Sequence, residues 1–248
     1  PATPVASLAL GQTISCAVSY PVPTSGSVTV TGTAGSSTAD PVPANNSANA
    51  TQTVVPQADM QAQTSVPTGV VAGQSVTVSG TCTNAGPSAA ATPTCALSGL
   101  PVGATQSCTP APAPNPLTVG SSITCTSTFV APANLGAGGS LAITTTAGAS
   151  TADPVAANNS DTEPLAITPQ ADMQASTSGF PANPPAGSTA TGTITCTNNG
   201  PSPAVNASCN VTVVPAGGTV TCTPNPAPNP LPVGSSISCV ASYPVPPT

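Results

Sequence analysis

Hydrophobic and polar residues alternate with a period of two through much of the chain, and this alternation predicts β-strands. In residues 74–84, Val76, Val78, Gly80 and Cys82 fall on one face, and serines and threonines fall on the other. Such a pattern is typical of a strand with one buried face. No stretch has a helical period, and frequent Pro and Gly residues interrupt the strands.

The same alternation predicts about seven short strands in the central part of the chain. Seven strands in a domain of about 113 residues, the length of the repeat described below, favour an immunoglobulin-like β-sandwich. The fold class is therefore expected to be all-β. The predicted strands lie near residues 58–66, 74–84, 91–98, 104–109, 119–130, 139–147 and 160–168.

Long phrases of the sequence occur twice. The phrase "STADPVPANNS" at 37–47 returns as "STADPVAANNS" at 150–160, and "PQADMQAQTS" at 56–65 returns as "PQADMQASTS" at 169–178. The spacing is about 113 residues, which is the length of a whole domain and exceeds that of a solenoid turn. The sequence therefore predicts tandem immunoglobulin-like repeats of about this length.

The phase of the repeat divides the chain into three parts. We expect the C-terminal part of one repeat at 1–55, a complete repeat at 56–168, and the N-terminal part of the next repeat at 169–248. The stretch 225–248 overlaps in phase with 1–25. We expect the chain to be a segment of a longer polypeptide or one unit of a continuous fibre. The alternative is a complete subunit whose partial ends complete each other between molecules.

The predicted interior is thin, because the chain has only two Tyr, two Phe and no Trp. Three of these aromatic residues, Tyr20, Phe129 and Tyr243, occupy one equivalent position of the repeat, which predicts an anchor in the core. The strand predicted around Tyr20 is expected to point Ile14 and Cys16 inward as well. Asn84 and Asn198, each followed closely by Gly-Pro, are expected to form turns between strands.

Nine cysteines indicate disulfide staples. Each repeat carries four, with gaps of 13, 13 and 17 residues, and without His or a CxxC pair a zinc site is disfavoured. An even number per repeat is typical of disulfides in an extracellular protein. Four cysteines allow three pairings, and we favour the pairing of neighbours, which closes short loops. The predicted pairs are Cys82–Cys95, Cys108–Cys125, Cys196–Cys209 and Cys222–Cys239.

The ninth cysteine, Cys16, aligns with Cys125 and is expected to be unpaired within these residues. Its counterpart would stand just before residue 1, so the odd number follows from where the sequence is cut. A free reactive thiol is the other interpretation.

The chain contains no Lys, Arg or His and six acidic residues. Because phosphate neutralisation requires cations, nucleic-acid binding is disfavoured, as is a polybasic membrane surface. No apolar run of about 18 residues predicts a membrane span. No base exists to activate a serine, and Asp161 and Glu163 have no acidic counterparts in the first repeat, so we expect no enzyme activity.

Acidic and amide side chains bracket each repeat junction. Calcium could bridge their oxygen atoms, although the spacing is not that of an EF-hand. The interpretation we favour is an Asx turn with a strand cap, and no other cofactor is indicated. The two sets are Asp40 with Asn45, Asn46 and Asp59, and Asp153 with Asn158, Asn159 and Asp172.

The phrases "ADMQASTSG", "GSTATGTITCTNNGPSPA" and "STADPVAANNS" resemble the bacterial conserved repeat domain, also called domain of unknown function eleven. The resemblance extends over essentially the whole chain. It implies tandem immunoglobulin-like modules on secreted or surface-attached bacterial proteins, with no enzyme activity and no defined ligand. The missing Lys and Arg and the four-cysteine pattern depart from the family and favour a durable, uncharged exterior.

Three functions fit these features. The first is a structural module of an extracellular bacterial filament, and the second is the stalk of an adhesin that presents a separate binding tip. The third is binding to ice or a crystal surface by rows such as Thr29, Thr31 and Thr33. For the filament, the expected partners are copies of the chain or covalently continuous repeats, head to tail. Residues 1–55 and 169–248 would each expose a hydrophobic face and are expected to be structured only through a neighbour or through continuation of the chain.

Overall fold

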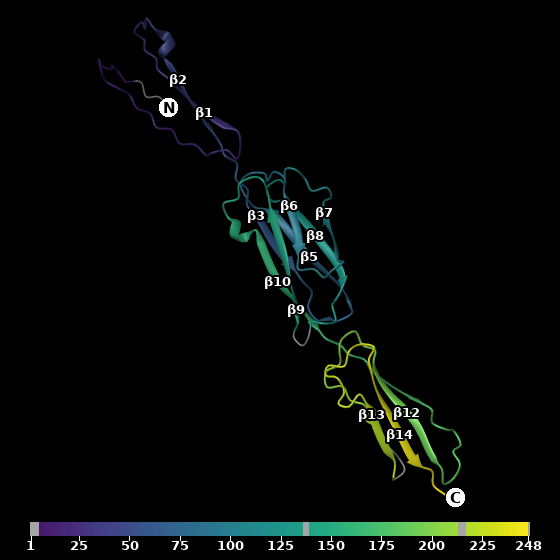
Figure 1. The fold of residues 1–248 in the computed structure, drawn as a ribbon. Helices are drawn as coiled ribbons and strands as arrows, with labels where there is room; N and C mark the ends of the chain where they lie inside the picture. The colour runs from purple at the N-terminus through teal and green to yellow at the C-terminus, as the bar shows by residue number, and fades with distance from the viewer. Residues whose placement is uncertain (1–4, 136–138, 213–216, 248) are drawn as a thin grey trace.

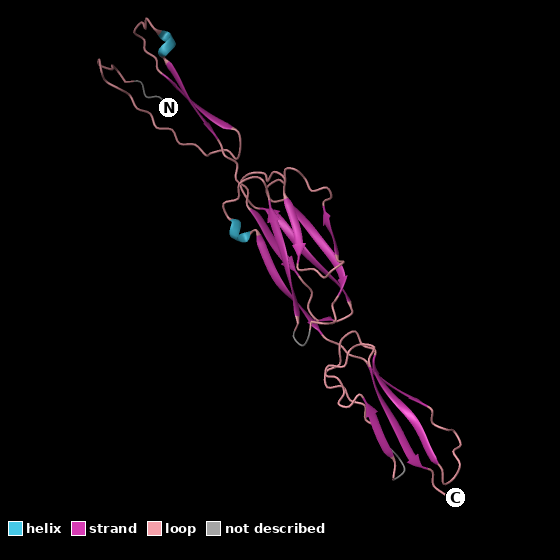
Figure 2. Ribbon diagram, in the orientation of Figure 1, coloured by secondary structure: helices cyan, strands magenta, loops and turns pink. Residues whose placement is uncertain are grey.

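The computed structural model describes residues 5–135, 139–212 and 217–247. Strands make up nearly all of its regular structure (Figure 2). The described residues contain two short 3-10 turns, η1 (Pro43–Asn45) and η2 (Ala156–Asn158), and no α-helix. The chain is therefore all-β, as its alternating pattern predicts.

Three segments follow one another along the chain and in space (Figure 1). The N-terminal segment (5–55) holds one hairpin, the middle segment (56–168) holds two sheets, and the C-terminal segment (169–247) holds one sheet. The hairpin and the C-terminal sheet lie at opposite ends of the molecule.

The middle segment consists of two four-stranded sheets that face each other across one core. One sheet has the order β3-β5-β8-β7, and the other has the order β4-β10-β9-β6. The seven strands predicted from the sequence are all present, and the two-residue β4 is additional. The strands are β3 (Met60–Ser65), β4 (Val70–Val71), β5 (Ser75–Asn84), β6 (Thr94–Ser98), β7 (Thr105–Thr109), β8 (Ser122–Val130), β9 (Ser140–Gly148) and β10 (Ser160–Thr168).

Both sheets of the middle segment contribute to its core. Met60 and Ile123 come from the first sheet and Ile143 and Leu165 from the second, and all four are at most 2% exposed. Phe129 is also buried here, as predicted for the aromatic anchor. Because the burial of a Leu or Ile side chain is worth about 1.5–3 kcal/mol, each sheet depends on the apolar face of the other.

The C-terminal segment reproduces only the first of these sheets. Its strands β11 (Met173–Ser178), β12 (Thr189–Asn198), β13 (Thr219–Thr223) and β14 (Ser236–Pro244) have the order β11-β12-β14-β13. The register also agrees, since Ile194 lies opposite Cys239 as Gly80 lies opposite Cys125. No second sheet covers it among the described residues.

The N-terminal segment has an antiparallel hairpin of β1 (Ser27–Thr33) and β2 (Ser47–Thr53). The hairpin and the C-terminal sheet form regular strands within their own segments, whereas the sequence led us to expect order only through a neighbour or through continuation of the chain. Hydrogen-bonded ladders internal to each segment account for the difference.

The strand expected around Tyr20 is absent, and this prediction was wrong. Residues 12–22 have no regular structure, and Ile14 is 54% exposed. The corresponding strand β14 pairs with both β12 and β13. Residues 12–22 have no such strands beside them, so Tyr20 instead donates a hydrogen bond to the Gln52 side chain at 3.1 Å.

Asn84 is fully buried and links three parts of the middle segment. Its amide nitrogen donates to the carbonyls of Ser88 and Leu117 at 3.0 Å each, and its side-chain oxygen accepts from the backbone of Gly86. Asn198 makes the corresponding bonds in the C-terminal segment. The sequence predicts a turn here, and the structure adds a buried polar connection that secures the loops to the end of the sheet.

Replacing Asn84 with Ala is expected to lower the free energy of unfolding of the middle segment by about 2–4 kcal/mol, because the Ser88 carbonyl loses a donor, the Leu117 carbonyl keeps only the Ala90 amide, and the Gly86 amide loses its acceptor. Urea denaturation followed by circular dichroism measures the change. Thr77→Ala is the control, since it removes one exposed Thr77–Thr128 hydroxyl contact and costs less than about 1 kcal/mol. Equal losses for the two variants would contradict the structural role of Asn84.

Candidate functional site

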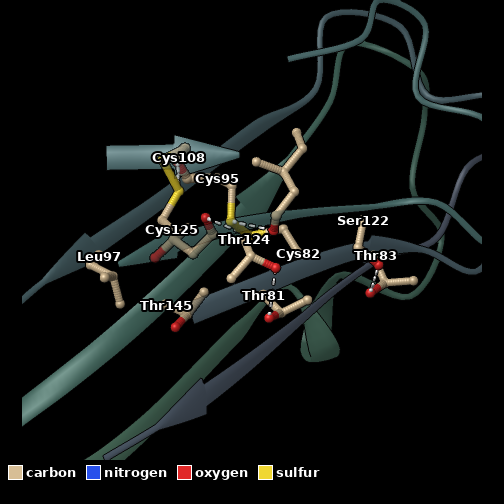
Figure 3. Close-up of a disulfide and its surroundings, with 12 residues drawn as sticks. Thr81, Cys82, Thr83, Cys95, Leu97, Cys108, Ser122, Thr124, Cys125 and Thr145 are labelled. Carbon is tan, nitrogen blue, oxygen red and sulfur yellow. Dashed lines mark hydrogen bonds between the residues drawn. A yellow bond between two sulfur atoms is a disulfide. The ribbon is translucent and has the colours of Figure 1, made fainter. Parts of the chain in front are cut away.

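Four disulfides secure the sheets, and they join the neighbouring cysteines. Cys82–Cys95 connects β5 to β6 and therefore ties one sheet of the middle segment to the other (Figure 3). Cys108–Cys125 joins directly opposed residues of β7 and β8 within one sheet. Disulfides that close loops of 13 or 17 residues each stabilise by about 3 kcal/mol, a large amount for a core this thin.

The same pairs occur in the C-terminal segment. Cys222–Cys239 joins opposed residues of β13 and β14, and Cys196–Cys209 ties β12 to a stretch without strand structure. Cys16 is a free, exposed thiol. Disulfides persist in oxidising compartments, so these four indicate a protein that works outside the cytoplasm.

One face of the C-terminal sheet is open and apolar. Phe180, Ile194, Ala241 and Tyr243 line a shallow depression of about 260 Å³, together with Thr177. The rings of Phe180 and Tyr243 stack with their centres 6.5 Å apart, and Phe180 covers the backbone of Gly192. Even so, Phe180 remains 36% exposed.

In the middle segment, the second sheet covers the corresponding face. Gly80 of β5 lies against Thr145 of β9 and Leu97 of β6, so closely that an added Cβ would collide with both. The Thr64 hydroxyl donates to Thr145 at 2.7 Å, and the Thr64 amide donates to the carboxylate of Asp161 at 2.6 Å. Thr177 is the counterpart of Thr64 and is exposed. The open face is therefore the surface that a second sheet closes in the middle segment.

The acidic residues near the segment junctions act as caps for backbone amides. Asp153 accepts from the amides of Val155 and Met60, each at 2.8 Å. Asn158 donates to Asp59 at 2.8 Å, so the structure groups Asp59 with Asp153 and Asn158, whereas the calcium hypothesis placed Asp153 with Asp172. No three acidic, Cys or His residues cluster among the described positions. These contacts favour the Asx turn and strand cap over a calcium site.

Threonine rows lie on the exposed faces of the sheets. Hydroxyls pair across neighbouring strands, as in Thr77–Thr128 at 2.7 Å and Thr29–Thr51 at 2.9 Å. A hydroxyl that is already paired with its neighbour is less available to bind an ice lattice. Cross-strand threonine pairs of this kind stabilise a sheet, and this is the role that the contacts support.

Comparisons with known proteins give only remote similarities. No family model and no curated protein matches the chain. A solved secreted serine protease, VesC from Vibrio cholerae, aligns at 14% identity with a TM-score of 0.29 over 75% of this chain and 46% of the protease. A protein of unknown function from Porphyromonas gingivalis W83 aligns at 13% identity with a TM-score of 0.25, over 75% of this chain and 83% of that protein. Neither similarity is close enough to carry an argument about fold or function.

Within the described residues, no helix has the length and apolar character required to cross a membrane. Sequence reasoning recognised the partial repeats but did not identify the residues of the open face. An alignment of the two copies of the repeat would have found Ile194, because it stands in the second copy where Gly80 stands in the first.

Peptic digestion under non-reducing conditions is expected to give a peptide with Cys82 and Cys95 joined internally, separate from one that links Cys108 to Cys125. Pepsin cleaves beside Leu, and Leu97 and Leu100 lie between the two pairs. Mass spectrometry identifies the products, and the same digest after reduction is the control. A peptide that links Cys82 to Cys125 would contradict the pairing.

Proposed function

We propose that the chain is a structural part of a long extracellular bacterial filament or surface fibre, built head to tail from immunoglobulin-like repeats of about 113 residues. The domains of this proposal are the end of one repeat at 1–55, a complete repeat at 56–168, and the start of the next at 169–248. The observation that carries the proposal is the way successive segments join end to end.

The two junctions use the same loop, the one that follows the buried asparagine. At the first junction, the Ser88 hydroxyl donates to the Thr24 carbonyl at 2.6 Å, and Pro87 lines a depression together with Val22 and Val54. At the second, Pro201, the counterpart of Pro87, lies against Gly73, where an added Cβ would stand 2.8 Å from the Pro201 Cβ. Use of the same loop at both junctions favours a regular rod, although the residues that the loop contacts differ between the two.

The composition supports a role in withstanding an extracellular environment. Four disulfides stabilise the thin cores, and the chain presents no Lys or Arg to trypsin-like proteases. It also has no His, Lys or Arg to activate a nucleophile, and the acidic residues Asp153 and Asp161 accept hydrogen bonds from backbone amides. We therefore expect no enzymatic turnover.

Small-angle X-ray scattering from the dilute chain is expected to show a rigid rod, with one cross-section along its length. Reduction of the disulfides is expected to unfold the segments and to replace the rod-like scattering profile with that of a flexible chain, because each bridge contributes about 3 kcal/mol to the free energy of unfolding. A flexible string or a compact particle before reduction would contradict the structural role. Electron microscopy then separates a filament, seen as uniform fibres, from an adhesin stalk, seen as single short rods.

A further inference from the structure

We propose that the open face of the C-terminal sheet binds the β1–β2 hairpin of a second copy of this chain. The inference rests on the proposed filament function and names the contact that would build the filament. The hairpin would take the place that β9 and β10 occupy in the middle segment, and it would close the surface lined by Phe180, Ile194 and Tyr243.

The hairpin has the form of β9 and β10 before it meets any sheet. Val30 pairs with Ala50 in the hairpin, and the corresponding residues Ile143 and Glu163 pair in the middle segment. The turns η1 and η2 also end alike, with Asn46 at φ −78° and ψ −5° and Asn159 at φ −76° and ψ −4°. Since the hairpin is already shaped, little ordering is required for it to bind.

Two of the polar contacts that hold β9 and β10 in place have counterparts at the two surfaces, whereas the bonds from Thr64 to Asp161 and Thr145 do not, because the hairpin has Ala48 and Gly32 at those positions. Asp153 caps Val155 with one carboxylate oxygen and accepts from the Met60 amide with the other. Asp40 already caps Val42 at 2.8 Å in the same way. Its second oxygen would accept from Met173, the counterpart of Met60.

A second polar contact transfers in the same way. Asn158 donates to Asp59 at 2.8 Å in the middle segment. The corresponding residues are Asn45 in the hairpin turn and Asp172 at the start of the C-terminal sheet. Docking of the hairpin would therefore restore two contacts that fix the second sheet over the first in the middle segment.

Side-chain size supports this particular pairing. In the middle segment, Gly80 leaves room for Thr145. The C-terminal sheet has the large Ile194 at the position of Gly80, and the hairpin has Gly32 at the position of Thr145. In the middle segment the larger residue of the pair, Thr145, belongs to the second sheet. In the proposed contact the larger residue, Ile194, belongs to the C-terminal sheet, and the hairpin supplies the small Gly32. An apolar face that carries Ile194 therefore fits a hairpin that carries Gly32.

The backbone edges also match. In the middle segment, β6 pairs with the outer edge of β9. Within the part of the chain that the structure describes, the corresponding stretch of the C-terminal segment, residues 208–212, has no strand partner, and β1 pairs with β2 alone. Docking would place the free edge of β1 beside residues 208–212, and both would gain a ladder of hydrogen bonds.

The contact would extend from molecule to molecule. The hairpin and the open face lie at opposite ends of one chain (Figure 1), so the contact joins different surfaces of successive copies. Head-to-tail contacts of this kind produce open fibres when they do not close into a ring. Residues 12–22 of the incoming copy would stay outside the sheet, because β14 already occupies the corresponding strand position.

The test is sedimentation velocity of the full 248-residue chain over a range of concentrations, with Cys16→Ser in every variant to prevent thiol exchange. The chain is expected to form a concentration-dependent series of oligomers. Gly32→Thr is expected to weaken the association about tenfold or more, because the added branch would meet Ile194 in the assembly. Within the free hairpin, a Cβ at Gly32 has only the Ala48 carbonyl oxygen nearby, at 3.9 Å, so the hairpin itself should be unaffected.

A compensating variant makes the test specific. Gly32→Thr combined with Ile194→Gly recreates the Gly80–Thr145 pair and is expected to recover most of the association. Thr31→Gln lies on the outward face of β1, and as the matched control it should leave association unchanged. A chain that stays monomeric up to its solubility limit, or an association that Gly32→Thr does not weaken, would overturn the proposal. Rod-like scattering from that same monomer would leave the proposed structural function standing.

Discussion

Burial of one apolar face of a four-stranded sheet against a second sheet is the interaction on which this protein depends. In the middle segment, Ile143 and Leu165 of one sheet cover Met60 and Ile123 of the other, and together they form the core. The C-terminal sheet has the same strand order, but among the described residues only the stretch 204–212 packs over part of it, so Ile194, Phe180 and Tyr243 lie on a largely open face. The hairpin of the N-terminal segment corresponds to β9 and β10 of the second sheet, but it packs on no other sheet among the described residues.

Disulfides and buried asparagines hold each four-stranded sheet together internally. Cys222–Cys239 and Asn198 fix the C-terminal sheet internally, so its strands form although its buried core is smaller than that of the middle segment. A chain with large side chains could rely on packing alone, but here only four aromatic residues are available. The covalent and polar connections thus keep an open surface ordered, which is what a specific docking surface requires.

The sequence predicts much of this fold because alternation and internal repetition are local signals. The seven strands of the middle segment and the all-β class follow from them. The two-residue β4 escaped prediction because it forms only where it pairs with the end of β10. The strand expected around Tyr20 failed for the converse reason, since its pattern is that of a strand but no described strand pairs with it. The role of Asn84 was also missed, because Asn before Gly-Pro predicts a turn whether its side chain is exposed or buried. The repeat aligns Ile194 with Gly80 and Gly32 with Thr145, but the candidate site required the structure, which alone shows that Gly80 and Thr145 touch.

A covalent trap of the contact tests the central claim most directly. Gly32→Cys and Ile194→Cys, introduced together into the Cys16→Ser chain, would place two thiols at the position where Gly80 and Thr145 touch in the middle segment. Under mild oxidation the account predicts a ladder of linear oligomers on a non-reducing gel, which collapses to one band on reduction. The matched pair Thr31→Cys and Ile194→Cys should give little of that ladder, because residue 31 faces away from the sheet. A chain that remains monomeric, or equal ladders from the two pairs, would contradict the account.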